Sequence, residues 1–328
     1  MPRIFVYIAH KNGVADDSAA ELLAAAKKTD AAASPTAIVT GSGPDLDAVC
    51  STLGASYGEV WKVANQALAY PNAELIRKAL VKIVPAGSTV LVAHEHFGID
   101  LGPGLSIKLN AAFVSDVLAI DGIDGTDLKV VRQEFGGQVS AHVRCDISSG
   151  AVITVRPGAF KPTDSGALGG TVVDKSAEVG AISAGRRYLQ TVVAEAGDVD
   201  ITKHNVLVSI GRGIQEKDNV SIAQDLADAL GAAVSCSRPV VDAKWLEKSR
   251  QVGSSGKTVK PKVYLACGIS GAFQHLAGIK GNPFIIAINK NPKAPIFQVA
   301  DVGIVDDILE FLPEFTNKVH EMRAVAAK

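Results

Sequence analysis

The sequence lacks the features of several common protein classes. Its 328 residues include only four cysteines, none in a C-x-x-C pair, which argues against a disulfide framework and a structural zinc site. Aromatic residues make up 5% of the chain, and 33 Lys and Arg residues balance 34 Asp and Glu residues to a net charge of −1. Nucleic-acid binding usually requires clustered positive charge and aromatic stacking faces, so we expect no nucleic-acid partner.

Long hydrophobic runs are scarce as well. No stretch reaches the ~18 consecutive apolar residues of a membrane span, so no membrane insertion is expected. The first apolar run, residues 4–9, is too short for the core of a signal peptide and predicts a β-strand, which favours a cytoplasmic location. What the chain does contain is 47% hydrophobic and 20% charged residues, a composition typical of a globular protein with a large core.

The first half of the chain alternates apolar segments with segments of helical pattern. This alternation predicts a parallel sheet with helices on both faces. We expect strands at residues 3–9, 36–40, 58–63 and 90–93, and helices at 18–28, 45–53, 72–83 and 101–110. Short strands separated only by turns follow at 113–120, 129–135, 138–145 and 151–155. They predict an antiparallel extension of the sheet.

The second half repeats the α/β pattern after an interruption. Residues 157–204 are polar and weakly patterned, which places a domain boundary near residue 203. Strands are then expected at residues 205–210, 232–236, 262–267, 284–289 and 303–305, and helices at 220–230, 272–276 and from 307 onward. The sequence therefore predicts an α/β protein of two domains, 1–203 and 204–328. Each has a mainly parallel sheet flanked by helices, the first with the antiparallel extension.

Two glycine-rich segments in the second half are candidate anion sites. Gly211-Arg212-Gly213 follows an expected strand, and its arginine favours a phosphate contact, but Glu216 occupies the third glycine position of a dinucleotide fingerprint. Residues 251–258 nearly match a phosphate-binding P-loop. Gln251 replaces the first glycine and no helix follows, so we reject an ATPase P-loop. The segment remains either a flexible loop or a loop whose amides and hydroxyls face a ligand.

The segment Gly268-Ile269-Ser270-Gly271-Ala272 is one residue short of the G-x-S-x-G nucleophile elbow. With Asp301 or Asp307 and then His320 downstream, the order Ser-Asp-His allows an α/β-hydrolase with Ser270 as nucleophile. The alternative is a helix N-terminus that presents backbone amides and the Ser270 hydroxyl to an anion.

His94-Glu95-His96 allows a metal interpretation. If this segment ended a strand, the two imidazoles would share one face. No third ligand is evident, so a solvated strand end is favoured.

In combination, the motifs of the second half resemble the alpha subunit of electron transfer flavoprotein. The first half agrees more loosely, at Leu101, Ser115-Asp116 and Val155-Arg156-Pro157 with Phe160. The segments that carry the resemblance are Gly211-Arg212-Gly213, Cys236-Ser237-Arg238-Pro239 with Asp242 and Trp245, Gln251-Val252-Gly253 through Gly256-Lys257, residues 268–278, Ala287-Ile288-Asn289-Lys290, Ala294-Pro295-Ile296-Phe297, Ala300-Asp301 and Gly303-Ile304-Val305.

The resemblance implies an electron carrier that works as a heterodimer with a beta subunit. One FAD would be held mostly by the C-terminal domain, while the N-terminal domain would contact the beta subunit. Electrons would pass from flavin dehydrogenases, such as the acyl-CoA dehydrogenases of fatty acid oxidation, to a membrane quinone oxidoreductase or a similar acceptor. No residue would need to act as acid, base or nucleophile, because electron transfer requires position and potential.

The resemblance also implies the residues that contact FAD. The hydroxyl near flavin N5 would be that of Ser255, the positive charge over the ring that of Arg238, and the group near flavin O2 that of His275. The full set is Arg212, Ser237, Arg238, Val252, Gly253, Ser254, Ser255, Ser270, Gly271, Ala272, Phe273, Gln274, His275, Asn289, Asp307 and Ile308.

Three other functions stay open. The closest is the alpha subunit of an electron-bifurcating flavoprotein, in which the partner subunit carries a second flavin. The hydrolase with Ser270 as nucleophile belongs to a different class, and a nucleotide-binding module without redox activity is the third.

Overall fold

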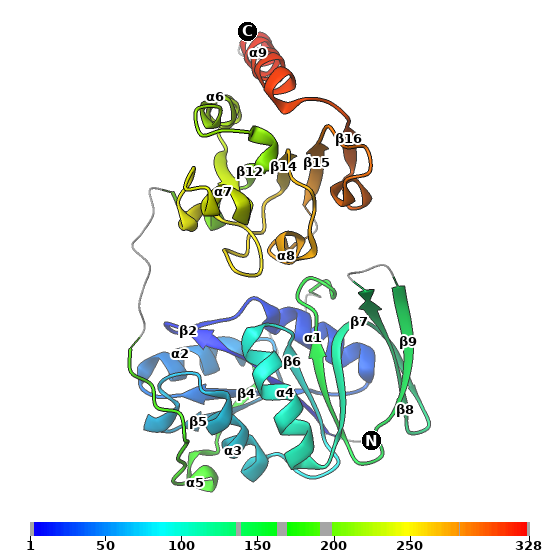
Figure 1. The fold of residues 1–328 in the computed structure, drawn as a ribbon. Helices are drawn as coiled ribbons and strands as arrows, with labels where there is room; N and C mark the ends of the chain where they lie inside the picture. Colours follow the sequence, from blue (N-terminus) through cyan, green and yellow to red (C-terminus); the bar gives the residue numbers. More distant parts are fainter. Residues whose placement is uncertain (1–2, 136–138, 163–168, 191–198, 282, 327–328) are drawn as a thin grey trace. The chain divides into compact units, whose positions relative to one another are not determined.

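The computed structural model describes residues 3–135, 139–162, 169–190, 199–281 and 283–326. Its contacts divide the chain into two compact units, Met1–Gln190 and Thr191–Lys328, each of the predicted α/β class (Figure 1). The boundary expected near residue 203 falls inside the second unit. The reason is that Ile201 is fully buried in the core of that unit, in one cluster with Leu207 and Tyr264.

The first unit is built on one nine-stranded sheet of order β11-β5-β4-β1-β6-β10-β7-β8-β9. Neighbours from β11 to β7 are parallel, and β7, β8 and β9 pair antiparallel, which confirms three of the four strands of the expected extension. The fourth, residues 151–155, was wrongly placed there: it pairs parallel with β6 and β7, because it is a continuous apolar run that is buried throughout. The strands are β1 (Ile4–Tyr7), β4 (Thr36–Gly41), β5 (Glu59–Ala64), β6 (Thr89–Ala93), β7 (Ala112–Asp124), β8 (Asp127–Glu134), β9 (Val139–Asp146), β10 (Ala151–Val155) and β11 (Thr171–Asp174). Gln138, where a strand was expected to begin, lies outside the described residues.

Helices cover both faces of this sheet because its central strands are apolar on both sides. Alternate residues of β1 enter different cores: Val6 joins the cluster of the first two helices, and Phe5 joins the cluster of the next two. The helices are α1 (Ser18–Thr29), α2 (Pro44–Leu53), α3 (Ala73–Ile83), α4 (His96–Leu109) and the single turn α5 (Ser176–Val179). Continuous apolar runs in parallel strands produce this double burial.

Some elements of the first unit carried no sequence signal. A small hairpin joins β2 (His10–Lys11) to β3 (Val14–Ala15), and β11 adds to the edge of the sheet beside β5. Most residues of β11 are exposed, so backbone pairing and not apolar burial holds this strand in place. Helix α4 begins at His96, earlier than the expected residue 101.

The second unit has a five-stranded parallel sheet of order β13-β12-β14-β15-β16. The strands are β12 (Val206–Ile210), β13 (Ala233–Cys236), β14 (Val263–Cys267), β15 (Phe284–Ile288) and β16 (Val302–Ile304). Its α-helices are α6 (Val220–Leu230), α7 (Arg238–Asp242), α8 (Phe273–Leu276) and α9 (Ile308–Ala326). In the described ranges of both units, the structure also has the short 3-10 turns η1 (Gln66–Leu68), η3 (Ile201–Lys203), η4 (Arg212–Ile214), η5 (Lys248–Arg250) and η6 (Pro295–Gln298).

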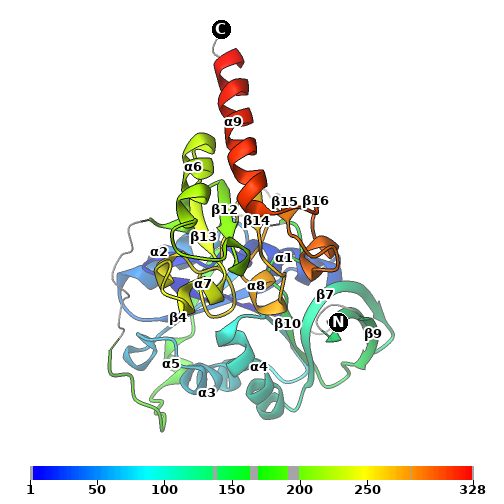
Figure 2. The ribbon, with the colours of Figure 1, turned by 45° about the horizontal axis from the view of Figure 1, so that its top comes forward.

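The two faces of the second sheet are covered differently. Helices α6 and α9 pack together on one face, where Leu226 and Leu312 are fully buried (Figure 2). The other face is covered largely by connecting segments, through Val252, Val259 and Ile296. Among the described residues, no helix combines the length and the apolar character that crossing a bilayer requires.

The start of α4 supplies a test of the packing. A Cβ at Gly98 would collide with the carbonyl oxygen of Ala93 at the end of β6. We therefore expect Gly98→Ala to lower the free energy of unfolding by about 1–3 kcal/mol, although alanine is the better helix former. Gly185→Ala is the matched control, because no atom lies within 4 Å of its Cβ position. Urea unfolding that gives both variants equal stability would contradict this packing.

Candidate functional site

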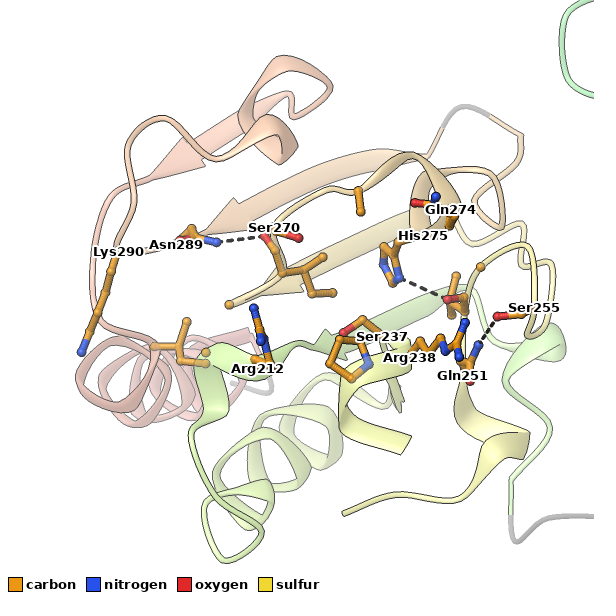
Figure 3. Close-up of a pocket in the computed structure, with 18 of the residues that line it drawn as sticks. Arg212, Ser237, Arg238, Gln251, Ser255, Ser270, Gln274, His275, Asn289 and Lys290 are labelled. Atoms are coloured by element: carbon orange, nitrogen blue, oxygen red, sulfur yellow. Dashed lines mark hydrogen bonds between the residues drawn. The ribbon is translucent and has the colours of Figure 1, made fainter. Parts of the chain in front are cut away.

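A pocket of about 540 Å³ opens at the carboxyl ends of four strands of the second unit (Figure 3). Arg212 follows β12, Ser237 follows β13, Ser270 follows β14 and Asn289 follows β15, and all four line the pocket. Ligands of open α/β sheets bind at this edge, because the connecting loops and the N-terminal ends of the following helices meet there. The position of the pocket therefore follows from the topology of the sheet.

The pocket brings together most of the residues that the sequence predicted. All sixteen predicted contacts except Gly271 and Phe273 line it: Arg212, Ser237, Arg238, Val252, Gly253, Ser254, Ser255, Ser270, Ala272, Gln274, His275, Asn289, Asp307 and Ile308. Gly271 is buried with φ +82 against the backbone of Ile296, so it shapes the loop. Phe273 begins α8 with 56% of its surface exposed.

The sequence prediction missed some lining residues. They are chain neighbours of predicted ones, and extending each motif by a residue or two would have found them. These are Gly213, Pro239, Gln251, Gly268, Ile269, Lys290 and Asp306. Gln251 had a signal of its own, because it departs from the P-loop pattern: its side-chain amide donates to Oγ of Ser255 at 2.9 Å.

The segment from Val252 to Ser255 is held tightly against α8. The amide of Ser254 donates to the carbonyl of Gln274 at 2.7 Å. Gly253 has φ +138, and a Cβ there would lie 2.8 Å from the same carbonyl oxygen. Glycine is therefore required for this close approach, and it allows the two serine side chains to line the pocket.

Positive and negative charges meet at the rim. Arg238 Nε lies 3.4 Å from Asp242 Oδ2, and both side chains are more than half exposed. Lys290 Nζ lies 2.6 Å from Asp307 Oδ2, and this contact holds the pKa of Asp307 below its usual value. Arg212 lines the same pocket and is exposed. An exposed ion pair is weak, so Arg238 can exchange Asp242 for a bound anion at little cost.

His275 is the most deeply buried ionisable group of the pocket. Only 6% of its surface is exposed, and burial lowers its pKa to about 4, so the ring is neutral at pH 7. Its Nδ1 lies 3.1 Å from the carbonyl oxygen of Val252, and its Nε2 lies 2.8 Å from the hydroxyl of Tyr264. Both ring nitrogens thus have protein partners, and the ring lines the pocket (Figure 3).

A hydrolytic triad is not assembled around Ser270 in the described part of the chain. His320 is exposed on α9 and does not line the pocket. Asp301 accepts the backbone amide of Ile285 at 2.7 Å, and Asp307 pairs with Lys290. His275 cannot act as the base, because both its nitrogens are occupied.

His94 and His96 do not share a strand face. His96 opens α4, while His94 Nδ1 lies 2.8 Å from Oγ1 of Thr154. His94 Nε2 lies 3.8 Å from Asp116 Oδ1, and Asp116 is bound by Arg156. Over the described ranges, no group of three or more His, Cys, Asp or Glu side chains has the arrangement of a metal site.

Comparison with known proteins covers both units. Residues 4–197 match the model of the electron transfer flavoprotein domain, and residues 200–280 match that of the electron transfer flavoprotein FAD-binding domain. The chain is 33% identical to electron transfer flavoprotein subunit alpha of Thermoanaerobacterium thermosaccharolyticum, with 98% of each chain covered. It is 34% identical to the protein of the same name from Methylophilus methylotrophus, over 96% of this chain and 98% of the other.

A third relative has a different name. The chain is 32% identical to the lactate dehydrogenase (NAD(+),ferredoxin) subunit LctC of Acetobacterium woodii, over 76% of this chain and 59% of that protein.

A substitution at Ser270 distinguishes a role in binding from a role as nucleophile. We expect Ser270→Ala to weaken retention of FAD by about 0.5–1.5 kcal/mol, the value of one neutral hydrogen bond. The dissociation constant can be measured from the fluorescence of released FAD. Covalent labelling of Ser270 by a fluorophosphonate probe would contradict the binding role and restore the hydrolase.

Proposed function

Because this chain belongs to the electron transfer flavoproteins, as an alpha subunit, we propose that it carries electrons on FAD from flavin dehydrogenases to a membrane quinone oxidoreductase or a similar acceptor. FAD belongs to the second unit, which matches the FAD-binding domain of the family. The observation that supports the site is the convergence of the predicted contacts on one pocket at the carboxyl edge of the second sheet.

The chemistry of the pocket fits FAD. Its volume of about 540 Å³ is in the range of roughly 300–1,000 Å³ that small-molecule sites occupy. Arg212 supplies a guanidinium that can take a phosphate in bidentate fashion, and Ser237 and Ser270 add hydroxyls. Val252 and Ile308 provide apolar surface. FAD supplies the electron-carrying chemistry, and these side chains bind it, orient it and limit its contact with water.

We assign the charge and hydrogen bonds that tune the flavin to two residues. Arg238 would place a positive charge near the ring, where it favours the added electron. Ser255, oriented by its hydrogen bond with Gln251, would direct a hydroxyl toward the reactive edge of the ring. No acid, base or nucleophile is required of the chain.

We also propose the partners and the setting. The family name "subunit alpha" supports a heterodimer with a beta subunit, which the first unit would contact. Donors such as acyl-CoA dehydrogenases would place the protein in fatty acid oxidation, in the cytoplasm. A bifurcating version is the second candidate, favoured by the similarity to the lactate dehydrogenase (NAD(+),ferredoxin) subunit, whose name includes two electron carriers. A second flavin in the partner subunit would distinguish it.

The heterodimer is tested by expression. Produced alone, the chain is expected to be insoluble or poor in FAD, because an obligate subunit without its partner exposes apolar surface. Co-expression with its beta subunit should give a soluble complex with one FAD per alpha chain, measured by flavin absorbance. A soluble lone chain with a full complement of FAD would contradict the proposal.

The role of Arg238 is tested by redox titration. We expect Arg238→Ala to lower the first one-electron potential of the bound flavin. A unit charge about 4 Å from the ring, in a medium with the dielectric constant of water, shifts a one-electron potential by roughly 40 mV. Solvent at the exposed rim limits the effect of Arg238 to this order. Arg238→Lys should keep part of the effect, since the charge remains while the planar fork is lost.

Asp242→Asn is the matched control for this titration. It breaks the same surface ion pair but leaves the arginine charge in place. If Arg238 served only that pair, all three variants would have the potential of the wild type.

A further inference from the structure

A buried network of hydrogen bonds connects the interior of the second sheet to the pocket. His275 and Val252 line the pocket, whereas Ser209 and Tyr264 do not. Ser209 lies on β12, Tyr264 on β14 and His275 on α8. The Tyr264 hydroxyl lies 2.7 Å from Ser209 Oγ and 2.8 Å from His275 Nε2. The opposite nitrogen of the imidazole lies 3.1 Å from the carbonyl oxygen of Val252. Two strands of the sheet interior are thus linked to the loop that carries Ser254 and Ser255.

The positions of the protons in this hydrogen-bond network follow from the chemistry of its donors and acceptors. A carbonyl oxygen only accepts, so Nδ1 of His275 carries the proton of the neutral ring and donates it to Val252. Nε2 is then the acceptor, and Tyr264 is the donor that faces it. A tyrosine hydroxyl has one proton, which it can give to Ser209 Oγ or to Nε2 of His275, and Ser209 can donate its own proton to the phenol oxygen. The Val252 carbonyl thus selects the Nδ1–H tautomer of His275, and the hydroxyl of Tyr264 stabilises that tautomer because it faces the lone pair on Nε2.

The loop depends on His275 in turn. The imidazole holds the carbonyl of Val252, and two residues later the amide of Ser254 donates to the carbonyl of Gln274 at 2.7 Å. These two bonds tie the loop to adjacent residues of α8. A ring that turned or changed tautomer would release the Val252 carbonyl, and the serines that follow would lose their fixed position. The side chains of this hydrogen-bond network are buried: Ser209 and Tyr264 are fully buried, and His275 is 6% exposed.

We propose that Tyr264 is a positioning residue of the flavin site. It fixes the orientation and tautomer of His275, and through His275 it fixes the loop Val252–Ser255 against the cofactor, which Tyr264 does not itself touch. This inference rests on the proposed function of the pocket.

The test compares buried tyrosines in the complex of this chain with its beta subunit. Tyr264→Phe removes one hydroxyl from the network. Tyr57→Phe is the matched control: Tyr57 is equally buried, donates to the carbonyl of Ala19 at 2.7 Å, and belongs to the first unit. We expect Tyr264→Phe to release FAD about two- to twelve-fold faster, the equivalent of one neutral hydrogen bond, and Tyr57→Phe to release it as the wild type does. Equal release by the two variants would overturn the inference.

The second measurement follows the tautomer by 15N NMR of the imidazole in the FAD-free complex. Wild type should show His275 protonated at Nδ1, and Tyr264→Phe a mixture of tautomers. An unchanged tautomer in Tyr264→Phe would overturn the inference. A complex that binds no FAD would instead refute the proposed function, and the tautomer would still be measurable.

Ser209→Ala gives the opposite prediction and keeps the test decisive if Tyr264→Phe fails to fold. Without Ser209 the tyrosine proton has one competing acceptor fewer besides His275, so FAD release should equal the wild-type rate or be slower. Faster release would indicate a network that serves stability alone, and would overturn the inference.

Discussion

The second unit depends on one geometric constraint: parallel strands end at the same edge of their sheet. Four largely apolar strands, from β12 to β15, are each followed by a loop at this edge. Because β12, β13, β14 and β15 are neighbours, segments separated by as many residues as Arg212 and Asn289 become walls of one pocket. Electron transfer needs this kind of site, in which the protein contributes position and electrostatics and the cofactor contributes the chemistry.

The exposed residues at the rim of the pocket and the buried residues at its base have different roles. At the rim, Arg238 and Asp242 form an exposed pair that is weak in water, so the arginine can be redirected to a ligand. At the base, His275 is buried and neutral, and its nitrogens are committed to Val252 and Tyr264. The exposed charge of Arg238 at the rim and the buried, neutral ring of His275 at the base suit a cofactor whose charge changes during each turnover.

The family resemblance named most of the residues that line the pocket, because the motifs that carry it are local. Gly211-Arg212-Gly213, Ser254-Ser255 and the stretch from Ser270 to His275 each lie directly after an apolar strand or beside a glycine that permits close approach. The departures have physical causes. Gly271 turns the backbone past Ile296, and Phe273 begins a helix with its ring largely exposed, so neither lines the pocket. The role of Tyr264 had no local signal, since in sequence it is one more residue of a buried strand.

The α/β class, the parallel sheets with an antiparallel extension and the family follow from the sequence, because apolar periodicity and glycine-rich motifs are properties of short segments. Three features depend on the tertiary structure. The edge strand β11 forms because the backbone of β5 is there to pair with it. His96 belongs to a helix and so does not face the same way as His94. The hydrogen bonds from Ser209 through Tyr264 to His275 exist because β12 and β14 are adjacent in the sheet while 55 residues separate the two hydroxyls along the chain. Such pairings depend on which strands become neighbours, and the pattern within any one segment does not specify that.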